Sequence, residues 1–149
     1  MSPIARRAGA FLLAIASAGC CPDLPDDLPS LLHLLDCTED LDTKHCAMEK
    51  IQDVYGAPAL LGALGGDNAC IRSEAAHGLM LYRSDRVEAA LIQAGGDDDP
   101  HVRMWAAFSL GEIGDKGALP ILALLAKDRK DFVAAMAIEA REKIRKRRR

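Results

Sequence analysis

Apolar residues recur every three or four positions along most of the chain, and short polar or glycine-containing breaks interrupt them. In the clearest stretch, 100–113, an apolar face runs through Val102, Ala106 and Leu110. A break at 114–117 precedes a second apolar stretch at 118–126. No run alternates β-branched or aromatic residues with polar ones, as a half-buried strand would. The pattern therefore predicts an all-α protein built from helical hairpins.

The hairpin pattern repeats along the chain. Gly65-Gly66-Asp67 recurs as Gly95-Gly96-Asp97, and Ile71-Arg72 with Ala75-Ala76 recurs as Val102-Arg103 with Ala106-Ala107. Each unit combines an Asp-rich turn, a helix A, a break and a helix B. Its small Ala pairs allow neighbouring helices to approach closely. We expect three to four such units stacked side by side, with the approximate bounds 43–66, 67–97, 98–127 and 128–146.

The unit at 99–122 carries the most complete motif. It reads Asp99-Pro100-His101-Val102-Arg103, then Ala106-Ala107, Leu110-Gly111, Ile113-Gly114-Asp115, Ala118, Pro120 and Leu122. This motif resembles the HEAT-like repeat named after phycobiliprotein lyases. The resemblance is strongest over 99–126, fair over 67–96, and partial over 43–64 and 128–146.

The resemblance implies a fold and several structural residues. The fold is a short right-handed α-α superhelix, an α-solenoid of about three to four HEAT-like hairpins that usually binds other proteins. It also implies that Arg72 and Arg103 pair with an aspartate of the preceding loop, with Asp67 and Asp99 as the repeat-structural acids. Position Ala134 lacks the arginine, so we expect the last unit to be a degenerate cap.

The first twenty residues have the three parts of a secretory signal peptide. Arg6 and Arg7 precede eleven apolar residues, 8–18, which are too few to span a bilayer. Cleavage after Ala18 would satisfy the small-x-small rule. Alternatively, 17–20 resembles a bacterial lipobox, although its serine replaces the usual leucine, and implies lipidation of Cys20. We favour the lipobox; a buried N-terminal helix of a cytosolic protein is the alternative to export.

These features predict an exported bacterial protein, periplasmic or lipid-anchored in the outer membrane. A signal peptide would occupy 1–19, and an acidic, proline-rich tether with a short helix would occupy 20–42. The repeat domain would span 43–146 and a basic tail 147–149. The C-terminal charge would suit lipid headgroups, or would be only a solvated helix end. We expect no nucleic-acid binding, because export argues against it and no aromatic residues are interleaved with the basic residues at the C-terminus.

The five cysteines bear on the same question. If Cys20 carries lipid, four disulfide candidates remain, which are Cys21, Cys37, Cys46 and Cys70. Four cysteines allow three pairings, and the sequence cannot choose among them. We expect Cys37 to pair with Cys46, its near neighbour. A haem or metal site of His33, Cys37, His45 and Cys46 is a lesser alternative, since neither CxxC nor HxxxH spacing is present.

No arrangement of residues points to catalysis. The chain lacks a GxSxG elbow and a phosphate-binding loop, and its four histidines occupy unrelated repeat positions. We therefore predict no catalytic residue, no metal, no cofactor and no small-molecule substrate, and thus a protein that is not an enzyme. Trp105 and Phe108 are expected in the core, with Phe108 as a possible interaction residue because it lies off the apolar line.

The predicted function is a non-catalytic protein-binding adaptor or scaffold of the bacterial cell envelope. It would bind an unidentified protein partner through the helix-B side of the solenoid and reach the membrane through its lipid anchor. The alternative is an accessory subunit of a lyase-like enzyme, by analogy with the repeat family.

Overall fold

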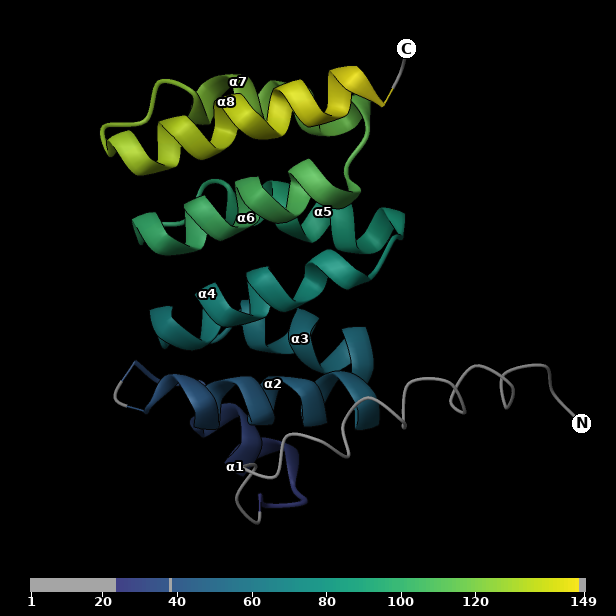
Figure 1. Ribbon diagram of the computed structural model, residues 1–149, viewed down its shortest axis with the longest axis vertical. Helices are drawn as coiled ribbons and strands as arrows, with labels where there is room; N and C mark the ends of the chain where they lie inside the picture. Colours follow the sequence, from purple (N-terminus) through teal and green to yellow (C-terminus); the bar gives the residue numbers. More distant parts are fainter. Residues whose placement is uncertain (1–23, 38, 148–149) are drawn as a thin grey trace, which may run out of the picture.

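The structure is a computed structural model that describes residues 24–37 and 39–147. Every regular element within these residues is a helix (Figure 1). The α-helices are α1 Leu28–His33, α2 Leu41–Val54, α3 Gly56–Leu64, α4 Ala69–Gly78, α5 Asp85–Ala94, α6 Pro100–Ile113, α7 Leu119–Leu125 and α8 Asp131–Lys146. Short 3₁₀ turns, η3 Leu79–Leu81 and η4 Lys116–Ala118, extend α4 and precede α7. The prediction of an all-α fold is confirmed.

The helices form two layers (Figure 1). The A helices α2, α4, α6 and α8 stack on one another, with the most extensive packing where α6 lies between α4 and α8. The B helices α3, α5 and α7 pack against the A helix that follows each of them. This arrangement is a short α-solenoid of helical hairpins, as predicted.

Side chains in the turns explain where the helices begin. Asp40, Asn68, Ser84 and Asp99 each accept a backbone N–H from the first turn of the following helix. Such caps satisfy N–H groups that have no partner within the helix. The Asp-rich turns seen in the sequence are therefore helix starts. α8 differs from these helices, because its N-cap residue Lys130 makes no side-chain cap hydrogen bond.

The core is aliphatic. Its largest fully buried side chains are all Leu, Ile or Val, namely Leu31, Leu35, Ile51, Leu60, Leu79, Val87, Leu91, Val102, Leu110, Leu122, Val133 and Ile144. Alanines fill the remaining contacts between A helices. The buried Ser109 hydroxyl donates to the Ala76 carbonyl at 2.7 Å, which joins α6 to α4 without leaving a polar group unpaired.

Part of the acidic segment packs onto the solenoid. Leu31 and Leu35, in and just after α1, are fully buried. Lys50 of α2 contacts this segment twice, through the Asp26 carboxylate at 2.8 Å and the Leu24 carbonyl at 3.0 Å. The short helix α1 in this segment packs against α2. The predicted signal peptide, Cys20 and Cys21 lie outside the described residues, and within 24–37 and 39–147 no helix is long and apolar enough to cross a bilayer.

Gly111 lies where α6 and α8 approach each other closely and provides the first test of this packing. A Cβ atom at this position would lie 2.9 Å from the Ala140 Cβ and 3.0 Å from its Cα. We expect Gly111→Val to lower the free energy of unfolding by about 2–3 kcal/mol, because α8 would have to move away from α6. The control is Gly62→Val on α3, where a Cβ meets nothing within 4 Å. Urea unfolding measures both; an equal loss at the two positions would contradict the close packing.

Candidate functional site

Large aromatic side chains gather on the exposed side of the A helices. Trp105, Phe108 and Phe132 are the Trp and Phe residues of the described chain, and none of them belongs to the buried core. Phe132 is 40% exposed, and the other two are half-buried. Residues of this kind usually fill cores. Their position on one surface therefore suggests a role in binding.

These aromatic rings contact two histidine rings in two groups. His77 of α4 stacks on Trp105 of α6 with centroids 4.0 Å apart, and Phe108 meets His77 and Trp105 edge-on at 5.9 and 5.5 Å. His101 of α6 stacks on Phe132 of α8 at 5.3 Å. We call these five residues the ring patch. It spans three successive A helices, so its shape depends on how the units stack.

The ring patch corrects two expectations. Trp105, expected in the core, only borders it, because the buried line of α6 passes through Val102, Ala106 and Leu110. Phe108 was also expected in the core and is likewise only partly buried, with the Lys143 Nζ atom 5.3 Å from the centre of its ring. Sequence reasoning missed the two histidines, although a signal was present. A step of thirty-one residues leads from His77 to Phe108 and from His101 to Phe132, so equivalent positions in neighbouring units lie side by side.

A hollow opens beside the ring patch, between the starts of α4 and α6. It is lined by Cys37, Ala69, Cys70, Ser73, Glu74, Asp99, His101 and Trp105. Burial raises the pKa of the Glu74 carboxyl, partly offset by the positive charge of Lys44. Burial also lowers the pKa of His77, so this imidazole is neutral at pH 7.

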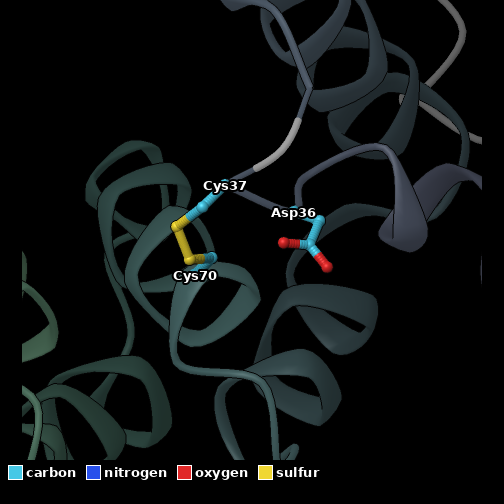
Figure 2. Close-up of side chains that lie close together, drawn as sticks. All are labelled: Asp36, Cys37 and Cys70. Carbon is cyan, nitrogen blue, oxygen red and sulfur yellow. A yellow bond between two sulfur atoms is a disulfide. The ribbon is translucent and has the colours of Figure 1, made fainter.

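One side of the hollow is a disulfide between Cys37 and Cys70, whose Cα atoms are 5.5 Å apart (Figure 2). The expected pairing of Cys37 with Cys46 is therefore wrong. Nearness in sequence misled the prediction: the end of α1 reaches the start of α4, whereas Cys46 is buried on α2.

The disulfide also bears on the metal-site alternative. Asp36 lies next to the disulfide, and these three residues are the one group within the described chain close enough to share an ion. Sulfurs in a disulfide are not the thiolates that metals bind. His33 and His45 do not join this group. The alternative site of His33, Cys37, His45 and Cys46 is therefore not assembled in this structure.

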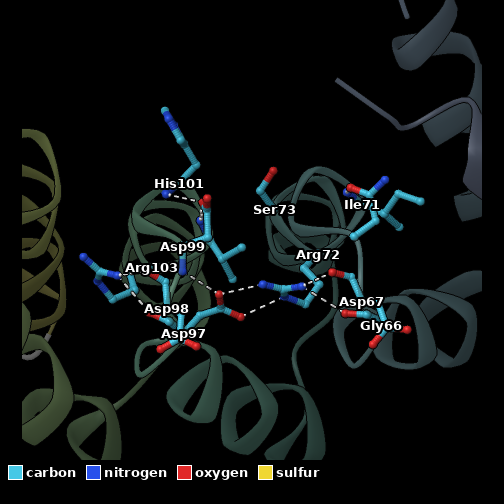
Figure 3. Close-up of polar contacts among 12 residues, drawn as sticks. Gly66, Asp67, Ile71, Arg72, Ser73, Asp97, Asp98, Asp99, His101 and Arg103 are labelled. Atoms are coloured by element: carbon cyan, nitrogen blue, oxygen red, sulfur yellow. Dashed lines mark hydrogen bonds and ion pairs between the residues drawn. The ribbon is translucent and has the colours of Figure 1, made fainter. Parts of the chain in front are cut away.

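Two arginines, Arg72 and Arg103, join the loops between units (Figure 3). We call these arginines and their partners Asp97 and Asp128 the arginine ladder. Arg72 binds both carboxylate oxygens of Asp97, each at 2.9 Å, and donates to the Gly66 and Asp67 carbonyls. One unit later, Arg103 binds Asp128 at 2.7 and 3.1 Å and donates to the Asp97 and Asp98 carbonyls. Each arginine thus connects the loop before its helix to the loop of the next unit.

The ladder corrects the expected ion pairs. The predicted partner of each arginine was an aspartate of the preceding loop, but that loop contributes carbonyl oxygens. The Asp99 carboxylate caps α6. The Asp67 side chain is exposed, and Arg72 contacts only its carbonyl. The reason is geometric, since stacking brings the following loop's carboxylate to the outer end of the arginine.

The ladder predicts a loss of stability in acid. Burial alone would raise the pKa of Asp97, but hydrogen bonds from Arg72 and the Asp99 N–H, with nearby arginine charges, hold it below its ordinary value. The Arg103 hydrogen bond likewise lowers the pKa of Asp128. A lowered pKa stabilises the folded state above the unfolded value of about 4, and this contribution disappears as the pH falls further.

We therefore expect the urea concentration at the unfolding midpoint to decrease as the pH is lowered from 5 to 2.5. The decrease should be smaller in Arg103→Ala, where Asp128 no longer has its guanidinium partner. The same decrease in both proteins would show that other groups cause the acid sensitivity.

Comparisons with known proteins support this architecture. The sequence profile of the family described as HEAT repeats matches residues 57–141. Among solved structures, human deoxyhypusine hydroxylase in complex with glycerol is similar, with a TM-score of 0.63 and 24% sequence identity over 85% of this chain. The match covers 46% of the hydroxylase chain, so this chain spans about half its length. Among curated proteins, none matches this chain.

The hydroxylase overturns one prediction. We expected a protein that is not an enzyme because catalytic motifs are missing, yet a similar structure belongs to an enzyme. Missing motifs are therefore no argument against catalysis in this architecture, and that prediction is withdrawn. At this level of identity the similarity shows the fold alone. The profile match covers more than half of the chain and agrees with the observed hairpins. The chain therefore belongs to the HEAT-repeat family.

Proposed function

We propose that this protein is a HEAT-repeat module that binds a partner polypeptide through the ring patch on its A helices. The proposal rests on one observation. Trp105, Phe108 and Phe132 are partly exposed on the A helices, whereas the core is aliphatic. Tryptophan and other aromatic residues are enriched where binding energy concentrates in protein interfaces. The rigid A helices hold these rings in fixed positions, which limits the entropy lost on binding.

This proposal moves the contact surface from the B helices to the A helices. The B helices α3 and α7 contain no charged residue, and Leu124 of α7 is 66% exposed. Isolated exposed aliphatic residues are common on protein surfaces. A cluster of five rings from three helices is a stronger indication of an interface.

Photo-crosslinking in the source cells tests the choice of surface. The variant Phe108→p-benzoylphenylalanine places the crosslinker in the ring patch, and Gln93→p-benzoylphenylalanine places it on the exposed side of α5. We expect a crosslinked polypeptide from position 108 and little from position 93. The opposite result would return the interface to the B helices, and no crosslink at either position would contradict a polypeptide partner.

We also propose, as a second candidate, that the module is the accessory subunit of an enzyme. The similarity to a hydroxylase supports this candidate, as does the resemblance to the lyase repeats. The polypeptide crosslinked at position 108 would then be an enzyme or its protein substrate. Its catalytic rate, measured with and without this chain, should change; an unchanged rate would contradict the candidate.

We further propose that the chain is exported and anchored by lipid at Cys20. The Cys37–Cys70 disulfide supports this proposal, because disulfides persist in oxidising compartments. The intact mass of the mature protein from membranes, with and without reductant, tests it. We expect a chain that begins at Cys20 with an acyl-glyceryl increment. A start at Gly19 would indicate free secretion, and a start at Met1 with reduced thiols would contradict export.

A further inference from the structure

We propose that the hollow beside the ring patch binds a cationic side chain, lysine or arginine, of the partner polypeptide. This inference rests on the proposed function and gives the partner a defined chemistry. It follows from the placement of Glu74 and Trp105, which occupy equivalent positions thirty-one residues apart in neighbouring units. Both side chains line the same hollow.

Glu74 supplies the negative charge. Its side chain is half-buried, and within the described chain its carboxylate has no hydrogen-bond or ion-pair partner. Lys44 on α2 influences it only through its charge. A partly buried carboxylate is stabilised by an opposite charge that also donates hydrogen bonds. An ammonium or guanidinium group entering the hollow would provide both.

Trp105 supplies an aromatic ring face that a cation can contact. Its indole ring lines the hollow and also stacks on His77. A cation near the face of a tryptophan is attracted by the ring quadrupole. The indole N–H has no acceptor within the described chain, so it can donate to a backbone carbonyl of the bound polypeptide. Because His77 is neutral, no positive charge behind the ring opposes the cation.

The hollow also contains a second carboxylate, that of Asp99. The Asp99 carboxylate lines the hollow and accepts the backbone N–H groups of His101 and Val102. Asp36, beside Cys37, accepts a hydrogen bond from Asn68 at 2.9 Å. The Glu74 and Asp99 carboxylates that line the hollow, with Asp36 next to Cys37, would repel an anionic ligand and attract a cationic one. The hollow therefore selects for basic residues.

The single tryptophan of the chain makes the test direct, since its fluorescence reports on the hollow itself. The probes are acetyl-Ala-Arg-Ala-amide and the same tripeptide with citrulline, a neutral isostere of arginine. We expect the arginine peptide to change the fluorescence saturably and to bind about tenfold more tightly than the citrulline peptide, the difference expected for a hydrogen bond to a charged group. Salt should weaken the arginine peptide's binding.

The variant Glu74→Gln keeps the shape of the side chain and removes its charge. We expect it to bind the arginine peptide about tenfold more weakly while its melting temperature stays unchanged. The matched control is Glu142→Gln on α8, an exposed glutamate outside the hollow, which should bind like the natural protein. Equal binding of the two peptides, or full binding by Glu74→Gln, would overturn the inference.

The two proposals can fail separately. A crosslink from position 108 that persists in Glu74→Gln, together with equal binding of the two tripeptides, would overturn the cation site and leave the polypeptide-binding function. Selective binding of the arginine tripeptide without any crosslinked polypeptide would contradict the function and keep the cation site.

Discussion

Replacing Arg103 by alanine should destabilise the protein by about 3 kcal/mol, the low end of the cost of removing one partner from a buried ion pair, because this pair is largely but not fully buried. Only 14% of the Arg103 side chain and 10% of the Asp128 side chain is exposed. Without Arg103, Asp128 would lose two charged hydrogen bonds, and the carbonyls of Asp97 and Asp98 would each lose a donor. The loop contacts on both sides of α6 would weaken together.

Urea unfolding measures this effect, with Arg86→Ala on α5 as the control. Arg86 is exposed, so its loss should change stability by no more than about 0.5 kcal/mol. Arg103→Lys should recover little, because an ammonium cannot reproduce the two-oxygen contact of the guanidinium. The double variant Arg103→Ala/Asp128→Asn should lose less than the sum of its single variants. If Arg103→Ala behaves like Arg86→Ala, the ladder does not hold the repeats together.

Removing the Cys37–Cys70 disulfide should destabilise the protein by about 3–4 kcal/mol, because the bond closes a loop with a sequence separation of 33. In the double variant Cys37→Ser/Cys70→Ser, the α1 segment would keep only its non-covalent contacts, which are the burial of Leu31 and Leu35 and the hydrogen bonds from Lys50, Tyr55 and Asn68. We expect the melting temperature to fall by about 10 °C or more.

Two internal checks accompany the melting experiment. The single variants should lose as much as the double variant, because either one abolishes the bond. The urea m-value should rise, since the unfolded chain is no longer constrained. An unchanged melting temperature in all three variants would show that the core contacts of α1 are sufficient alone.

The repeat pattern predicted the helices and their order because helix formation is mainly local. Apolar residues at spacings of three and four define a buried face, and Asp99 with Pro100 defines a helix start within four residues. The same pattern, compared with itself at thirty-one residues, predicted that the hairpins stack. These conclusions need no knowledge of the distance between units.

The candidate site was less predictable because it is formed between units. Trp105 follows the apolar spacing of its helix, but only the packing of α6 against α4 and α8 leaves it at the edge of the core. His77 has no feature in the sequence that marks it as the ring stacked on Trp105. Glu74 also lies far from Trp105 in sequence, and the two line one hollow because α4 and α6 are neighbours.

The sequence by itself thus determined an all-α HEAT-repeat fold, its repeat positions and its helix starts, through local periodicity and capping. Only the tertiary structure decided that Cys37 pairs with Cys70, that Arg72 reaches Asp97, and which rings share a surface. Those pairings depend on the offset and rotation between successive hairpins. That geometry results from all the side chains packed between the helices, so no single segment of the sequence specifies it.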